Sequence, residues 1–203
     1  MTVLLERILV KSLGRIEYAV ALDKMREFTR RRGEATPDEL WLVEHPPVYT
    51  LGQGAKDIVV GNGIPVVKSD RGGEITYHGP GQVVLYALID LARRGIKVKQ
   101  FVALLEQSVI DLVGPRAERK AGAPGVYVGG AKIAALGIRV TRGRSYHGLA
   151  LNVDMDLAPF AAIDPCGFPG LQVTQTKDIK LEKSRKEMED QLAKLLIARI
   201  ENA

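Results

Sequence analysis

The sequence has one cysteine, few aromatic residues and no long apolar run. One cysteine excludes an internal disulfide, and a metal site built on it would need histidine or carboxylate ligands. No segment approaches the eighteen or so uncharged apolar residues of a membrane span, and the first residues lack the apolar core of a signal peptide. We therefore expect a soluble protein of the cytoplasm, without a metal ion and without a membrane partner.

The balance of residue types is that of a globular protein. Hydrophobic residues make up 46% and charged residues 26% of the chain. A length of 203 residues suffices for one domain or at most two small ones, and we expect a single domain over residues 1–203. The net charge of +5 suits nucleic acid, anionic lipid or an acidic protein. Because aromatics are only 5% and never alternate with lysine or arginine, a base-stacking surface for nucleic acid is disfavoured.

Two kinds of apolar periodicity divide the chain. Helical spacing marks residues 16–32, 98–113 and 183–200. Strand-like apolar runs cover residues 3–10, 39–44, 48–51, 64–67, 83–89, 125–128, 133–140 and 148–153. Strands occupy much of the middle, with helices near both ends and one inserted. The pattern predicts an α/β (α+β) domain in which helices flank a largely antiparallel sheet.

The densest chemical signal is the run from Arg71 to Gln82, which holds four glycines and a proline in twelve residues. Such a run costs conformational entropy unless tight backbone geometry is needed. Its glycines let a ligand approach the main chain, and Arg71, Tyr77, His78 and Gln82 add polar contacts. The spacing is neither that of a phosphate-binding P-loop nor that of a dinucleotide-binding turn. A plain turn between strands is the alternative, but the many polar side chains favour a binding loop.

Two later segments also carry candidate chemistry. Lys132 stands among small residues at the start of a strand. A lysine there is usually only solvated, yet small neighbours leave room for a substrate to reach its ammonium group. His147-Gly148 repeats the pairing of His78-Gly79. A histidine beside a strand is as often a hydrogen-bonded core residue as a site residue, so both interpretations stay open.

Cys166 lies between Pro165 and Gly167, after the last apolar strand. A lone cysteine is more often a small buried hydrophobic residue than a nucleophile, but this loop setting favours exposure. Only about 3% of an ordinary thiol is thiolate at pH 7. A nearby ammonium that lowered the thiol pKa to about 7 would make the thiolate fraction roughly half. Lys132 is the candidate, and as a neutral amine it could then act as a base, with the two titrations coupled.

In order along the chain, these segments resemble the lipoyl(octanoyl) transferase family. The resemblance runs from about Leu40 to Cys166, and six segments together make it specific. They are residues 44–52, 71–82, 124–128, 132–137, 147–153 and 165–167. Two positions depart from the family pattern. Gln175 follows Val173-Thr174 where members often have serine, and Asp164 stands where asparagine is common.

The resemblance implies the fold of the biotin and lipoate protein ligases and a transfer reaction without cofactor. An octanoyl group would pass from octanoyl-acyl carrier protein to a lysine of a lipoyl domain, in 2-oxoacid dehydrogenase E2 subunits or glycine cleavage H protein. By position, Cys166 matches the family's acyl-thioester nucleophile and Lys132 the residue that lowers its pKa. His147 and Gln82 are expected to support the site. The implied substrate-binding residues are Arg71, Gly72, Gly73, Glu74, Ile75, Thr76, Tyr77, His78, Ala135, Leu136, Gly137, Gly148, Leu149 and Ala150.

Three other functions fit parts of the sequence. An ATP-dependent lipoate or biotin ligase would share the fold but form an acyl-adenylate and would not need Cys166. A thioesterase would use the cysteine and give the acyl group to water. A non-catalytic acyl- or protein-binding domain would leave the thiol with ordinary reactivity.

Overall fold

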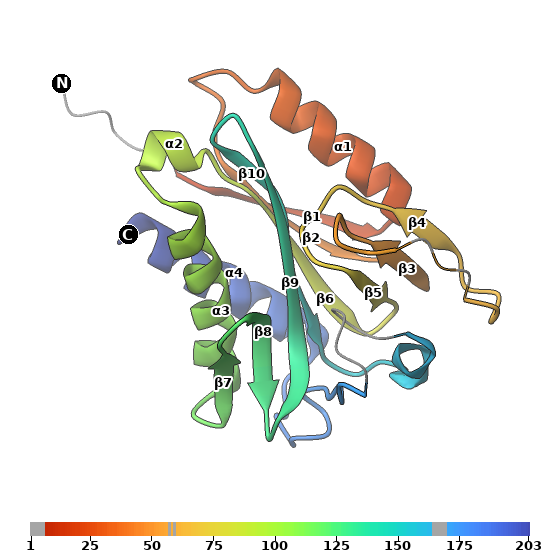
Figure 1. Ribbon diagram of the computed structural model, residues 1–203. Helices are drawn as coiled ribbons and strands as arrows, with labels where there is room; N and C mark the ends of the chain where they lie inside the picture. Colours follow the sequence, from red (N-terminus) through yellow and green to blue (C-terminus); the bar gives the residue numbers. More distant parts are fainter. Residues whose placement is uncertain (1–6, 57, 59, 164–169) are drawn as a thin grey trace.

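The computed structural model describes residues 7–56, 58, 60–163 and 170–203 (Figure 1). A seven-stranded sheet has the strand order β1-β2-β6-β10-β9-β8-β7. Only β1 and β2 pair in parallel within it, so the sheet is largely antiparallel as predicted. Its strands are β1 (Leu9–Arg15), β2 (Glu39–Glu44), β6 (Gln82–Leu88), β7 (Ala117–Lys120), β8 (Ala123–Val128), β9 (Ala131–Thr141) and β10 (Arg144–Asn152).

Helices cover both faces of this sheet (Figure 1). Helices α3 (Val98–Val113) and α4 (Arg185–Glu201) lie side by side on one face, and α1 (Tyr18–Arg31) lies on the other. Strand β2 shows why two cores form. Leu40 and Leu42 pack with α3 and α4, whereas Trp41 and Val43 pack with α1, because successive side chains of a strand point to opposite faces.

A second, three-stranded sheet lies beside the first, in the order β4-β3-β5 (Figure 1). It consists of β3 (Val48–Leu51), β4 (Val66–Lys68) and β5 (Ile75–His78), with its own apolar core that includes the 3-10 helix η1 (Ala158–Ala162). Strand β5 is formed by the middle of the glycine-rich run. The run is therefore a loop followed by a strand, which places its polar side chains against the main sheet.

Local signals explain where the helices begin and end. Helix α4 starts with a capping box, in which Ser184 and Glu187 satisfy each other's backbone N–H groups. Helix α1 ends on Arg30 and Arg31, whose charges suit the negative end of the helix dipole. No helix within the described residues is long and apolar enough to cross a membrane.

The structure corrects several predicted elements. Of the opening strand predicted over 3–10, residues 3–6 lie outside the described residues, and the strand that is described is β1 at Leu9–Arg15, a mostly exposed edge strand that lacks a strong apolar pattern. The strand predicted over 64–67 is shifted to Val66–Lys68. The short helix α2 (Leu91–Arg94), β7, η1 and the separate small sheet were not expected. Each of these is too short or too polar for periodicity to reveal.

Candidate active site

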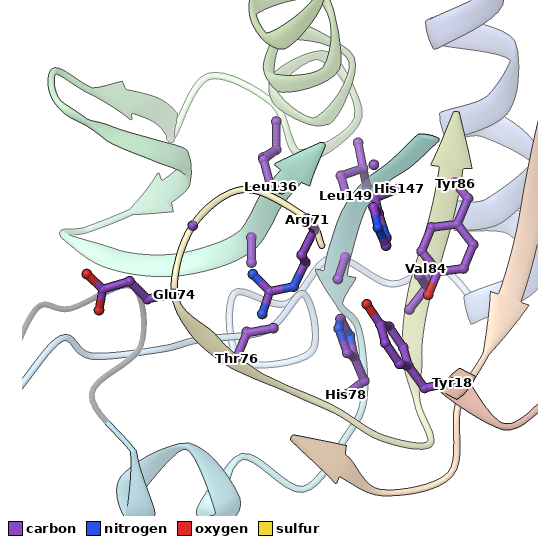
Figure 2. Close-up of a pocket in the computed structure, with 15 residues that line it drawn as sticks. Tyr18, Arg71, Glu74, Thr76, His78, Val84, Tyr86, Leu136, His147 and Leu149 are labelled. Atoms are coloured by element: carbon purple, nitrogen blue, oxygen red, sulfur yellow. The ribbon is translucent and has the colours of Figure 1, made fainter. Parts of the chain in front are cut away.

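A pocket opens on the α1 face of the main sheet, and its floor is made by β6, β10 and β9 (Figure 2). The strand register sets Val84, Ala150 and Ala135 in one cross-strand row. The next row on the same face joins Tyr86, Gly148 and Gly137. Four of these six residues are alanine or glycine, so the floor is hollow where larger side chains would fill it. The row between them, with Leu149 and Leu136, faces mainly into the core under α3 and α4.

Two floor glycines are required by close backbone approach. A Cβ on Gly148 would lie 2.1 Å from the Leu85 carbonyl oxygen, so no side chain fits there without moving the sheet. A Cβ on Gly137 would lie 2.8 Å from the Gly72 carbonyl oxygen. The glycine-rich loop reaches this point because the Gly72 N–H donates to the Ile138 carbonyl oxygen at 2.9 Å. This bond holds the loop over β9 as the pocket roof.

The roof is anchored by Arg71, whose side chain is buried. Its guanidinium donates to the Thr50 carbonyl oxygen at 2.6 Å and to the Thr50 hydroxyl, which ties the loop to β3. Along β5, Thr76 and His78 point into the pocket (Figure 2). Ile75 and Tyr77 belong instead to the core of the small sheet, because alternate residues of a strand face opposite sides.

His78 is held in a neutral form on the pocket wall. Its Nδ1 donates to the Gln82 amide oxygen at 2.8 Å, and Gln82 is itself bonded to Asn152. The ring stacks on Tyr18 of α1, with centroids 5.8 Å apart. Burial, aided by the nearby His45 ring, lowers the pKa of His78 to about 3. Gln82 does not line the pocket and acts here as the hydrogen-bond partner of His78.

His147 also lines the pocket, and Asp70 orients it. The His147 Nε2 lies 2.8 Å from Asp70 Oδ1. Asp70 Oδ2 accepts from Arg26 Nε at 2.9 Å and from the Tyr146 hydroxyl at 2.8 Å. Burial opposes ionisation of Asp70, but the hydrogen bonds from His147, Tyr146 and Arg26 outweigh it and hold its pKa well below the ordinary value. Burial lowers the pKa of His147, and the Asp70 bond only partly offsets this.

Lys132 lies near the start of β9 and is buried, with 3% of its surface exposed. The expectation of a merely solvated lysine is therefore wrong. Its Nζ donates to the Pro124 carbonyl oxygen at 3.3 Å and lies 5.3 Å from the Tyr127 ring centroid. Pro124 lines a second cavity, which shares Gly73, Glu74, Leu136 and Gly137 with the pocket. The lysine thus lies next to the same hollow without lining the pocket itself.

The chain segment after Cys166 returns to Lys132. The Lys132 N–H donates to the Gln172 carbonyl oxygen at 2.8 Å, and the Thr174 N–H donates to the Lys132 carbonyl oxygen at 2.9 Å. Val173 forms a parallel bridge with Lys132. Cys166 itself, together with Asp164, lies outside the described residues. Gln175, the other departure from the family pattern, accepts a bond from the Met155 N–H through its side chain at 2.8 Å.

The pocket brings together most of the predicted substrate-binding residues. Those on its walls are Arg71, Gly73, Glu74, Thr76, His78, Ala135, Leu136, Gly137, Gly148, Leu149 and Ala150, together with the supporting His147. Gly72 lines the second cavity. Sequence reasoning missed Tyr18, Val84 and Tyr86, which also line the pocket, and Asp70, which orients His147. In the sequence, Tyr18 stands out only as part of a helical stripe. Val84 and Tyr86 stand out only as part of a buried strand.

No group of three or more histidine, cysteine or carboxylate side chains that could hold a metal ion occurs among the described residues. Among the described residues of the pocket, Arg71, His78, His147, Tyr18 and Tyr86 each make a side-chain hydrogen bond to another protein group. The arrangement suits the binding of a mainly apolar ligand, with neutral polar groups placed at one end.

This fold and pocket define the class of lipoate and biotin protein ligase catalytic domains. A lipoate-protein ligase A bound with ATP superposes with a TM-score of 0.75 at 15% identity, over 96% of this chain and 85% of that one. Biotin protein ligase from Aquifex aeolicus gives 0.54 at 9% identity, over 97% and 70%. These likenesses establish the fold, and the lipoyl protein ligase A/B catalytic domain model matches residues 17–197.

Sequence similarity narrows the class. An octanoyltransferase of Dechloromonas aromatica is 57% identical over 197 residues, which cover 95% of this chain and 96% of that protein. The octanoyltransferase of Azoarcus sp. is 63% identical over 177 residues, which cover 84% and 78%. The chain belongs to the octanoyltransferase family. The family and the fold predicted from the ordered motifs are thereby confirmed.

Proposed function

We propose that this chain transfers an octanoyl group from octanoyl-acyl carrier protein to a lysine of lipoyl domains, through a thioester on Cys166. The observation that carries the proposal is the pocket floor of Ala135, Gly137, Gly148 and Ala150, in a chain whose relatives are octanoyltransferases. An extended acyl chain needs an apolar channel without bulky side chains, and these two cross-strand rows supply one.

The reaction proceeds in two acyl transfers. The Cys166 thiolate attacks the carbonyl carbon of the carrier thioester, and the carrier thiolate leaves and takes up a proton. This exchange converts one thioester into another and needs no ATP. The neutral amine of the acceptor lysine then attacks the enzyme thioester. An amide forms, the Cys166 thiolate leaves, and the amine loses a proton. Because an amide is more stable than a thioester, the second step runs downhill.

Lys132 is the proposed partner of Cys166. A buried ammonium beside the thiol would stabilise the thiolate, and the neutral amine would then take the proton from the attacking lysine. Two contacts support this role. The Lys132 amine is fixed by the Pro124 carbonyl beside the hollow, and residues 172–174 pair with the Lys132 backbone only six positions after Cys166.

The proposed partners are acidic carrier and acceptor domains, among them lipoyl domains of E2 subunits and the glycine cleavage H protein. The net charge of +5 would speed encounter with such domains and make the association rate fall with added salt. We place the reaction in the cytoplasm, where a single nucleophilic thiol stays reduced.

Intact-mass measurement tests the proposal. The wild-type chain is mixed with octanoyl-acyl carrier protein in the absence of acceptor. We expect an octanoyl adduct that hydroxylamine removes, that Cys166→Ser does not form, and that disappears when a lipoyl domain is added and gains the octanoyl mass. A single-turnover experiment that shows neither adduct nor acylated acceptor would refute the thioester route.

The same experiment separates the alternative functions. Release of free octanoate at the turnover rate, without acylated acceptor, would identify a thioesterase. Full acceptor modification by Cys166→Ala with ATP and free octanoate would identify a ligase that forms an acyl-adenylate. Alkylation of Cys166 that rises only near pH 8 to 9, as for an ordinary thiol with a pKa of about 8.5, would identify an inert cysteine.

A further inference from the structure

His147 presents a buried hydrogen-bonding atom that the fold leaves unused. Its side chain is almost wholly buried, and no group in the described part of the chain bonds to Nδ1. Its neighbours at this end of the pocket are satisfied by the protein. The Tyr86 hydroxyl lies 2.6 Å from His45 Nε2, and the Tyr18 hydroxyl lies 2.7 Å from the Ser69 hydroxyl. A buried polar atom without a partner is uncommon and needs an explanation, and His147 is the pocket-lining residue among those of the described chain that carry one.

The hydrogen bond with Asp70 fixes which proton the ring carries. An ionised carboxylate only accepts, so the ring nitrogen facing Asp70 must bear the hydrogen. The ring is neutral because burial lowers its pKa, and a neutral imidazole has one N–H. The unused Nδ1 is therefore a lone-pair acceptor. A ligand that satisfies it must bring a donor.

The backbone supports a functional reason for this placement. His147 has a φ of 60°, in the left-handed region, although β9 pairs with β10 on both sides of it; the pairing with β6 begins at the next residue, Gly148. Histidine adopts this conformation more readily than most residues other than glycine, but it still carries strain. With this backbone the ring lines the pocket while Asp70 holds its Nε2.

Strand register places His147 at the end of the pocket far from Lys132. A Cβ on Gly125 would contact both the Lys132 Cε and the Ala134 carbonyl oxygen, so the lysine amine lies level with Ala134. His147 pairs with Ile138, four residues further along β9, or about 13 Å away. An extended eight-carbon acyl chain spans roughly 9 Å. The C–O bond of a hydroxyl group on its last carbon, and a hydrogen bond of about 3 Å from that hydroxyl oxygen, complete the distance.

We propose that this end of the pocket recognises acyl chains carrying a hydrogen-bond donor on their last carbon, such as an 8-hydroxyoctanoyl group, with His147 Nδ1 as the acceptor (Figure 2). This inference rests on the proposed function, since it concerns the far end of the same acyl chain. The hydroxyl group donates a hydrogen bond and takes no part in the acyl transfer. An unsubstituted octanoyl chain fits the same channel and leaves Nδ1 unpaired.

The experiment compares two isomeric acyl groups on the same carrier protein. An 8-hydroxyoctanoyl group can donate from its end, whereas a 7-methoxyheptanoyl group has the same number of chain atoms but can only accept. For the wild type we expect the ratio of their kcat/KM values to favour the hydroxyl compound roughly tenfold, because the methoxy group has no hydrogen to donate to the Nδ1 lone pair. The 15N resonance of His147 Nδ1 should also shift when the enzyme is loaded with the hydroxylated chain.

The variant Asp70→Asn tests the inference by exchanging which ring nitrogen of His147 carries the proton. Arg26 and Tyr146 both donate to the oxygen at the Oδ2 position, so the amide oxygen stays there and the NH2 group faces His147. The ring must then accept at Nε2 and carry its proton on Nδ1. Because a hydroxyl oxygen can accept as well as donate, we expect the preference for the hydroxyl compound to fall to a ratio near one. Asp154→Asn, which removes the same charge from an exposed pair with Lys177, should keep the wild-type ratio.

The outcomes distinguish this inference from the proposed function. Normal octanoyl transfer together with a hydroxyl-to-methoxy ratio near one and an unmoved Nδ1 resonance would overturn the role of His147 and leave the proposed function intact. Absence of octanoyl transfer by the folded wild type would overturn the proposed function. The wild-type ratio and the resonance need no variant, so the test stands even if Asp70→Asn does not fold.

Discussion

Filling the pocket floor should shorten the acyl chain that the enzyme accepts. Ala150 is the central residue of the first floor row, between Val84 and Ala135. Ala150→Leu adds three carbons to this row, which takes the room of about three methylenes. Each methylene that is no longer buried costs about 0.8 kcal/mol, so octanoyl loses about 2.4 kcal/mol, or roughly sixtyfold in kcat/KM. An acetyl group is too short to reach this row, which lies about one residue beyond the level of Ala134, so it should keep its wild-type value.

The assay measures transfer from octanoyl- and acetyl-acyl carrier protein to one lipoyl domain, and the ratio of the two kcat/KM values in the variant is compared with that in the wild type. Any loss of folded enzyme cancels in this ratio, which matters because overpacking typically costs 1–3 kcal/mol of stability. Ala198→Leu makes the same chemical change on the exposed side of α4 and should leave the ratio unchanged. An unchanged octanoyl-to-acetyl ratio in a folded Ala150→Leu enzyme would show that the acyl chain does not lie on this floor.

Two further variants test the proposed partner of Cys166 and the buried charges, and a third serves as a control. Lys132→Met should move the alkylation profile of Cys166 to higher pH, and an unchanged profile would remove the lysine from the mechanism. Asp38→Ala should lower the free energy of unfolding in urea by about 3–5 kcal/mol. The reason is that it removes the carboxylate paired with Arg32 and Arg94, whose side chains are 0% and 2% exposed. Burial raises the pKa of Asp38, but hydrogen bonds from a backbone N–H and these arginines outweigh it, so the pKa is lowered in the folded state. The Asp38 contribution is therefore complete above its unfolded pKa of about 3.9 and is lost as the pH falls through the folded value. The difference from wild type should narrow in acid, and a difference that does not depend on pH would contradict this assignment. Glu27→Gln, in an exposed pair, should cost no more than about 0.5 kcal/mol.

The main elements of the fold were predictable because their apolar residues repeat strongly. The predicted boundaries of 39–44 and 98–113 coincide with those of β2 and α3. Strand β7, of sequence Ala-Glu-Arg-Lys, has no apolar alternation because it is an edge strand with three exposed residues. Strand β5 was hidden by the glycines that flank it. Pairing partners far apart in sequence create these strands, and no local pattern reports such pairing.

The pocket was only partly predictable for the same reason. The motifs pointed to Ala135–Gly137 and Gly148–Ala150, which line the pocket, and strand register explains why these two segments lie together. They are opposite each other in adjacent strands, so their small residues form a continuous hollow. Within the glycine-rich run, however, the prediction treated residues 71–78 as one binding segment. The strand alternation of β5 sends Ile75 and Tyr77 to a different core.

The two His-Gly pairs show how the same sequence feature acquires different chemistry in the fold. His78 finds its partner four residues away, in Gln82, and its pairing could be sought within the local sequence. The partner of His147 is Asp70, which lies 77 positions away and is placed by the loop that precedes the pocket roof. That bond sets the tautomer of His147 and leaves an acceptor at the far end of the acyl channel. A substitution of Asp70 should therefore alter which acyl chains the enzyme accepts, although Asp70 acts on them only through His147. The hydroxyl-to-methoxy ratio measures this effect directly.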